Sequence, residues 1–313
     1  MKKLFKSLTS RLLSFRLGKH SSLIAMAILV GVLSGGANML FRFTLEWTRN
    51  MIFHGGSELL GIHKGGIYRI LLPLLPVTGA LLLIPLSYKF PGMVNGYGFP
   101  SFLENVNIKD GIIKFKTIIL KIIAPALTIG SGGSAGVEGP IAQIGGAIGS
   151  ITGQVFNVSG NRMKLLIAAG AAGGIAATFN APIAGVMFAT EIVLLGNFEL
   201  TSFGVIVISS GIATVISRIY YGSNPAFIVP QYELAGLYEA PLYLIMGLFI
   251  GPVAVLYIKF FYKVKDKFES LNINPYFKPV IGAFLVGVIG IFSPQIMSDG
   301  YKYIEEALKG NIV

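Results

Sequence analysis

The sequence contains no cysteine, which excludes a disulfide scaffold. Charged residues are scarce as well, at 12% of 313 residues, and an average soluble domain has about twice that share. Hydrophobic residues account for 53%, so the chain has too much apolar surface to be disordered. This composition disfavours a large soluble enzyme and predicts an all-α polytopic membrane protein without enzymatic activity.

Acidic residues are especially few, since 14 of them stand against 25 lysines and arginines and leave a net charge of +11. On a soluble protein this excess would suggest nucleic-acid binding. Between apolar spans it indicates loop charge that orients helices, so we expect a lipid bilayer and no nucleic acid as a partner. Basic residues alternate with Leu and Phe over residues 1–20, which predicts an amphipathic helix on the cytoplasmic surface.

Long uncharged stretches recur along the chain, each close to the ~20 residues that cross a bilayer. They lie at residues 21–41, 70–88, 165–190, 200–217, 241–258 and 279–298. Many of them contain Gly or Pro, so we expect several short, broken or tilted helices. Such breaks survive in lipid only where protein or a water-filled cavity covers the freed backbone groups, which favours a transporter or channel over a simple anchor.

Two pairs of segments resemble each other: residues 31–35 match 247–251, and residues 76–80 match 279–283. The basic N-terminus places the start of the first span in the cytoplasm, and the lysines that follow the 241–258 span place its end there. Matched segments of opposite orientation predict an inverted repeat, and chance matching of Gly and Leu is the alternative. We expect a first repeat at 21–235, an incomplete second repeat at 236–313 and no soluble regulatory domain.

Residues 128–140 form a glycine-rich segment, Thr-Ile-Gly-Ser-Gly-Gly-Ser-Ala-Gly-Val-Glu-Gly-Pro. A phosphate-binding P-loop is excluded because the segment has no lysine, and a dinucleotide fingerprint is excluded because its flanks have membrane length. Pro140 suits the first turn of a helix. The free N–H groups and the positive dipole end of such a helix start can bind an anion, and the alternative is an ordinary break between packed helices.

The segment at residues 95–100, Asn-Gly-Tyr-Gly-Phe-Pro, also places glycines before a helix that starts with proline. Two helix starts aimed at one point would hold an anion without a full positive charge, weakly enough for release. No cofactor or metal site is expected, because the three histidines are scattered. The candidate anion-binding residues are Gly96, Tyr97, Gly98, Phe99, Gly136, Val137 and Gly139.

Glu138 lies between uncharged stretches, and an ionisable group at membrane depth is costly. The N–H groups that would bind an anion at this helix start would also stabilise a carboxylate. Glu138 can therefore occupy the place of the anion and release it on protonation, which predicts a gate coupled to pH. The alternative is a carboxylate at a mouth that only caps its helix.

The segment Gly136-Val137-Glu138-Gly139-Pro140 resembles the Gly-Lys/Arg-Glu-Gly-Pro motif of the CLC family of chloride channels and proton/anion antiporters. Residues 170–185 are similar to a long and specific stretch of that family, and the match continues in order over nearly the whole chain. The resemblance implies a helical fold of inverted repeats and a homodimer with one pathway per subunit. It also implies that Glu138 is the external gating glutamate and that the amides of residues 136–139 face the anion.

The sequence departs from the family pattern at several positions. Tyr97 stands where the family usually has an anion-coordinating serine, and Val137 replaces a basic residue. Glu191 matches the first of two glutamates found in antiporters, and Ile192 replaces the second, which serves the internal proton route. The later Gly-x-Phe-x-Pro motif and a pore-lining tyrosine have no counterpart, since Tyr301 occupies the repeat position of Tyr97 and comes too early for that role.

We therefore expect a CLC-type channel for chloride or a similar small anion, gated by Glu138, in the plasma membrane of a prokaryote with its N-terminus in the cytoplasm. Because Ile192 cannot carry a proton, passive conduction is favoured over proton-coupled antiport, which stays an alternative. Two others are a truncated fragment that lacks half of its anion site and does not transport, and an unrelated transporter of anionic metabolites.

Overall fold

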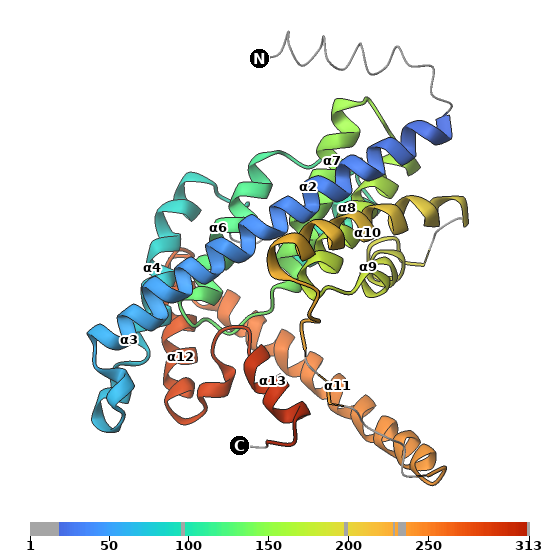
Figure 1. Cartoon of the computed structure of the whole chain (residues 1–313). Coiled ribbons are helices and arrows are strands. Elements are labelled where there is room, and N and C mark those ends of the chain that lie inside the picture. The colour runs from blue at the N-terminus through green and yellow to red at the C-terminus, as the bar shows by residue number, and fades with distance from the viewer. Residues whose placement is uncertain (1–18, 95–97, 197–199, 228, 231–235, 312–313) are drawn as a thin grey trace.

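The computed structural model describes residues 19–94, 98–196, 200–227, 229–230 and 236–311. Every regular element in these residues is helical, which confirms the expected all-α fold. The amphipathic helix predicted for residues 1–20 lies almost wholly outside them. The first described helix, α2 (Lys19–Thr48), continues through the π-helical turn η1 (Arg49–His54) into α3 (Gly55–Leu59), so one long rod crosses the molecule (Figure 1).

Five helical stretches among the described residues are long and apolar enough to cross a membrane. They are Ser21–Leu59, Gly66–Lys89, Asn161–Phe179, Phe203–Tyr221 and Glu239–Ser270. These stretches coincide with five of the six uncharged segments in the sequence, which confirms a multi-pass membrane protein. The sixth segment forms α12 (Lys278–Phe292), a helix of 15 residues.

The core of the molecule lies where α7 (Glu138–Val155) packs against α8 (Asn161–Phe179), with α10 (Leu200–Tyr221) and α2 packed on α8 as well. Gly145 and Gly149 of α7 allow this contact. A Cβ atom on Gly145 would collide with the carbonyl oxygen of Gly170, and one on Gly149 with that of Leu166. Small residues of this kind let helix backbones approach closely, and close approach is a main source of helix association in lipid.

The uncharged stretch at 165–190 is broken, as the glycines and prolines in these spans predict. Helix α8 ends at Phe179, and the next residue, Asn180, has a left-handed backbone with φ of 53°. The side chain of Asn180 donates to the carbonyl oxygens of residues 223 and 224 at 2.7 and 2.9 Å and accepts from Nε of Arg218 at 2.6 Å. The chain then forms the short helix α9 (Pro182–Phe188) and the π-helical turn η4 (Ala189–Val193).

The remaining elements of the first two thirds of the chain lie outside this core. They are η2 (Ile62–Lys64), η3 (Gly66–Leu71), α4 (Leu74–Lys89), α5 (Phe99–Asn107) and α6 (Lys116–Gly130). Helix α6 packs against α2, α4 and α7, and so links the rod to the core.

The last third of the chain begins with α11 (Glu239–Ser270), which projects from the body and has no buried residue (Figure 1). Helix α12 returns and packs against α4. These two helices contain the matched segments 76–80 and 279–283, and they lie side by side. The repeat boundaries at 235 and 236 stay a prediction. The chain closes with η5 (Pro294–Ile296) and α13 (Tyr301–Leu308).

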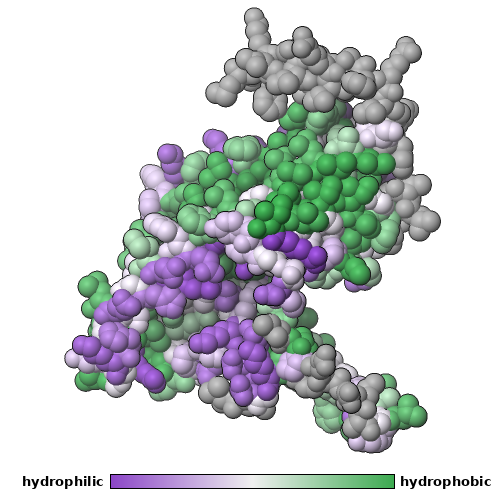
Figure 2. Space-filling model, viewed as in Figure 1, coloured by the Kyte–Doolittle hydropathy of each residue, from purple (hydrophilic) through white to green (hydrophobic). Residues whose placement is uncertain are grey.

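The surface is divided between apolar and hydrophilic areas. Figure 2 shows apolar side chains over the upper part of α2 and over α10, and hydrophilic side chains over the lower part of α2 and over α13. Ile28, Leu29, Val32 and Leu33 of α2 are among the exposed apolar side chains. The apolar area suits contact with lipid, and the hydrophilic area lies around the candidate site.

Candidate functional site

Glu138 is the first residue of α7, and Val137 before it is buried. Glu138 itself is half-buried. Its carboxylate folds back over the preceding turn, because a Cβ atom on Gly136 would collide with Oε2 of Glu138. The first N–H groups of a helix have no partner within the helix. The carboxylate therefore lies at the start of its own helix, where a negative charge is favoured.

Tyr301, the first residue of α13, contacts this carboxylate. Its phenol Oη donates to Oε1 of Glu138 at 2.6 Å, although the two residues are 163 positions apart. The Tyr301 ring also packs against Phe179 and Phe227, with ring centroids 6.1 and 5.2 Å away. Burial, followed by the bond to Glu138, raises the pKa of Tyr301 above its ordinary value, so the phenol keeps its proton.

The turn that leads into α13 is bonded to the glycine-rich segment. The backbone N–H of Ala135 donates to the carbonyl of Ser298 at 3.2 Å, and the N–H of Ser298 donates to the carbonyl of Gly132 at 3.3 Å. Arg49 of η1 donates to the Ser298 hydroxyl at 3.1 Å and to the Asp299 carboxylate at 2.6 Å. These bonds fix the start of α13, and with it Tyr301, beside the start of α7.

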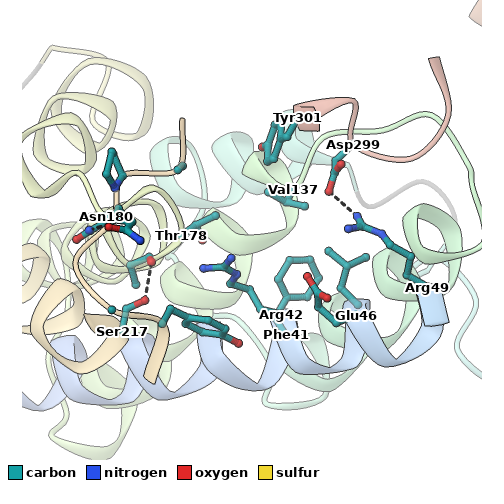
Figure 3. Close-up of a pocket in the computed structure, with 17 residues that line it drawn as sticks. Phe41, Arg42, Glu46, Arg49, Val137, Thr178, Asn180, Ser217, Asp299 and Tyr301 are labelled. Carbon is teal, nitrogen blue, oxygen red and sulfur yellow. Dashed lines mark hydrogen bonds and ion pairs between the residues drawn. The ribbon is translucent and has the colours of Figure 1, made fainter. Parts of the chain in front are cut away.

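A cavity of about 250 Å³ opens next to these two helix starts (Figure 3). Its walls come from α2, the turn before α7, the end of α8, the segment after α10 and the turn before α13. The lining residues that matter here are Arg42, Glu46, Arg49, Val137, Asp299 and Tyr301. Figure 3 shows Arg42 reaching into the cavity, and its guanidinium lies 4.0 Å from the ring centroid of Tyr221.

The family model described as "Voltage gated chloride channel" matches residues 79–313, which is most of this chain. The chain belongs to the voltage-gated chloride channel family. The resemblance of the glycine-rich segment and of residues 170–185 to the CLC family is thereby confirmed. Membership also overturns the alternative of an unrelated metabolite transporter.

Curated relatives cover nearly all of this chain, but they are longer. The chain is 31% identical over 301 residues to "Chloride channel protein CLC-e" of Arabidopsis thaliana, covering 91% of this chain and 42% of that protein. It is 29% identical over 298 residues to "H(+)/Cl(-) exchange transporter ClcA" of Vibrio campbellii, covering 93% and 63%. The chain thus spans less than two thirds of the length of these relatives.

Solved structures of CLC proteins share the fold. A slow cyanobacterial Cl⁻/H⁺ antiporter superposes with a TM-score of 0.78 at 23% identity, over 93% of this chain and 68% of that one. A CLC-type fluoride/proton antiporter superposes with a TM-score of 0.74 at 21% identity, over 93% and 71%. At these identities the likeness supports the helical architecture alone.

The second predicted helix start, at residues 95–100, is described only in part. Gly96 and Tyr97 lie outside the described residues. Gly98 precedes α5, and Phe99 begins it and packs against Phe188 of α9 with ring centroids 5.9 Å apart. Helix α5 meets the middle of α7, where a Cβ atom on Gly146 would collide with Phe102. The convergence of the two helix starts on one anion stays a prediction.

The other residues predicted to bind the anion in the glycine-rich segment flank Glu138 at the start of α7. Gly136 is exposed, Val137 lines the cavity, and a Cβ atom on Gly139 would meet open space. Glu191 and Ile192 lie in η4, and both are exposed. Among the described residues, no group of three acidic or histidine side chains is placed to hold a metal ion.

Sequence reasoning missed Tyr301 as the partner of Glu138. In the sequence, Tyr301 occupies the repeat position of Tyr97 and comes too early to be the pore-lining tyrosine of the family, so it was not expected at the anion site. The available signal was the match in sequence between Gly300-Tyr301 and Gly96-Tyr97, and Tyr301 is the residue at which α13 begins. That match gives no distance to Glu138, which depends on the packing of α13 against the turn before α7.

Proposed function

We propose that this protein transports chloride or a similar small anion across the membrane as a CLC-type channel and that Glu138 is its gate. The observation that carries the proposal is the carboxylate of Glu138, half-buried and folded over the start of its own helix beside a cavity. The candidate anion ligands are the backbone groups of residues 136–139, together with the segment 96–99.

The carboxylate of Glu138 and a free anion compete for the same place at the start of α7. The unpaired N–H groups at the start of α7 and the positive end of its dipole attract one negative group, either the carboxylate or a free anion. While Glu138 is charged and in place, the anion is excluded. Protonation removes the charge of the carboxylate, weakens its hold on the helix start and admits the anion.

The first prediction concerns Glu138→Gln, which cannot carry the charge. We expect chloride efflux from liposomes containing the variant to exceed that of the wild type and to lose its dependence on pH. Glu104→Gln is the matched control, because Glu104 forms an exposed pair with Lys109 at 2.9 Å, and its efflux should equal the wild type. Equal flux and equal pH response in the wild type and Glu138→Gln would remove Glu138 from the gate.

Proton-coupled antiport is the second candidate, and the name of one relative above, the H(+)/Cl(-) exchange transporter of Vibrio campbellii, favours it. Ile192, in the place of the second antiporter glutamate, argues against it because its side chain cannot bind a proton. Reversal potentials under opposed chloride and proton gradients separate the two. A potential that follows chloride alone supports the channel, and a shift with the proton gradient supports antiport.

The third candidate is a fragment that does not transport. Two observations favour it: the chain covers only 42% and 63% of the length of the two relatives above, and no residue of α11 is buried. The DNA beyond the Val313 codon tests it: a reading frame that resumes with a Gly-x-Phe-x-Pro motif would support the fragment.

We also propose a homodimer in a prokaryotic plasma membrane, which cross-linking in native membranes tests.

A further inference from the structure

The hydrogen bond between Tyr301 and Glu138 connects the last described helix of the chain to the proposed gate. Resting on the proposed function of Glu138, we infer that the Tyr301 hydroxyl holds the carboxylate at the start of α7 and donates to the incoming anion when the carboxylate leaves. We call the Tyr301–Glu138 bond the latch. Tyr301 is then a positioning residue for the gate and a ligand for the anion.

The geometry of the phenol suits both roles. Its distance to Oε1 of Glu138 is 2.6 Å, which is typical of a strong hydrogen bond to a charged acceptor. The backbone N–H of Val137 also interacts with the phenol oxygen. Edge contacts with Phe179 and Phe227 restrict the ring, so the hydroxyl stays in place when the carboxylate moves.

When the latch is broken, the Tyr301 hydroxyl needs a new hydrogen-bond acceptor. Once the carboxyl group of Glu138 has swung away, the phenol proton loses its partner in a half-buried position. Donors in such places almost always find an acceptor. Tyr301 and Val137 both line the cavity, so an anion that enters it meets a neutral O–H donor at the start of α7.

The charged groups around the cavity do not replace this donor. Arg42 and Glu46 face it from α2, Arg49 from η1, and Asp299 from the turn before α13. Two positive and two negative groups leave no net formal charge, and Arg49 is already paired with Asp299 at 2.6 Å. The raised pKa of Tyr301 keeps its phenol protonated, so the donor is present at every pH at which the gate works.

Tyr301→Phe tests the latch, because it removes the hydroxyl and keeps the ring that packs against Phe179 and Phe227. We expect efflux at neutral pH to rise roughly tenfold, which corresponds to about 1.4 kcal/mol. The phenol holds the carboxylate by the 2.6 Å hydrogen bond, and without it the carboxylate should leave the start of α7 more often. Tyr303→Phe on the same helix is the control and should match the wild type.

A double variant separates the latch from a structural effect. In the Glu138→Gln background the gate has no charge to hold, so Tyr301→Phe should add no flux at saturating chloride. The chloride concentration for half-maximal flux should instead rise several-fold, since an anion ligand is lost. An equal increase of flux in both backgrounds, or an unchanged half-saturating concentration in the double variant, would overturn the inference.

A readout without transport distinguishes failure of the latch from failure of the proposed function. Infrared spectra of the purified chain should contain carboxylate bands that Glu138→Gln removes. Tyr301→Phe should shift the frequency of these bands, because the hydrogen bond from the phenol is lost. A wild-type chain that passes no anion defeats the proposed function and leaves this comparison valid, and an unshifted frequency defeats the latch.

Discussion

Arg49 joins the rod of α2 and η1 to the turn that carries Tyr301. Its guanidinium donates to Asp299 and Ser298, and the side chains of Arg49 and Asp299 are 24% and 16% exposed. An ion pair this sheltered is less screened by water than a surface pair, so the loss of one partner leaves a charge poorly compensated. The position of Tyr301 thus depends on residues of the first helix.

Asp299→Asn should weaken this connection. We expect a loss of about 1.5–3 kcal/mol in the free energy of unfolding, the range for hydrogen bonds to charged groups. Flux should also shift toward that of Tyr301→Phe, because the turn before α13 loses an anchor. Lys109→Gln is the control, since its pair with Glu104 is about half exposed, and we expect a cost below about 1 kcal/mol. Equal melting temperatures of Asp299→Asn and the wild type would contradict the prediction.

At the scale of the helices, the sequence predicts what depends on local composition. The apolar spans and the helix that starts at Glu138 follow from uncharged length, glycine and proline, and the structure has them. The π-helical turns η1 and η4 have no such signal. The end of α8 before Asn180 depends on bonds of that residue to Arg218 and to residues 223 and 224, and the latch spans 163 positions, so both arise only from tertiary packing.

The contact between α7 and α8 gives a prediction about helix packing. A Cβ atom on Gly145 would collide with the backbone of Gly170. Because backbone cannot move aside as a flexible side chain can, Gly145→Ala should separate the helices and cost about 1–3 kcal/mol. Gly211→Ala in α10 is the control: its Cβ atom meets open space, and alanine favours a helix by about 1 kcal/mol over glycine. In thermal unfolding experiments in detergent, Gly145→Ala should therefore have a lower melting temperature than the wild type, and Gly211→Ala should not.

At the scale of the whole molecule, the two parts of the chain differ in how they bury surface. In the most apolar stretch of Asn161–Phe179, 78% of the residues are buried, whereas none is buried in the most apolar stretch of Glu239–Ser270. Helix α11 exposes large apolar side chains such as Leu248, Phe249 and Leu256. An apolar helix with no protein partner is stable only in lipid or against further protein, so α11 defines how this part of the chain sits in the bilayer.

The orientation of α11 can be measured because the chain has no cysteine, so any introduced cysteine is the single labelling site. Lys265 follows the apolar part of α11, and its side chain is exposed beside Glu269 at 3.4 Å. The lysines there should hold this end in the cytoplasm. We expect a membrane-impermeant maleimide to label Lys265→Cys in inverted vesicles and not in intact spheroplasts. Glu58→Cys, at the far end of the first span, should label in the opposite way. Labelling of Lys265→Cys from outside would reverse the orientation, and labelling from both sides would mean that α11 does not span the bilayer.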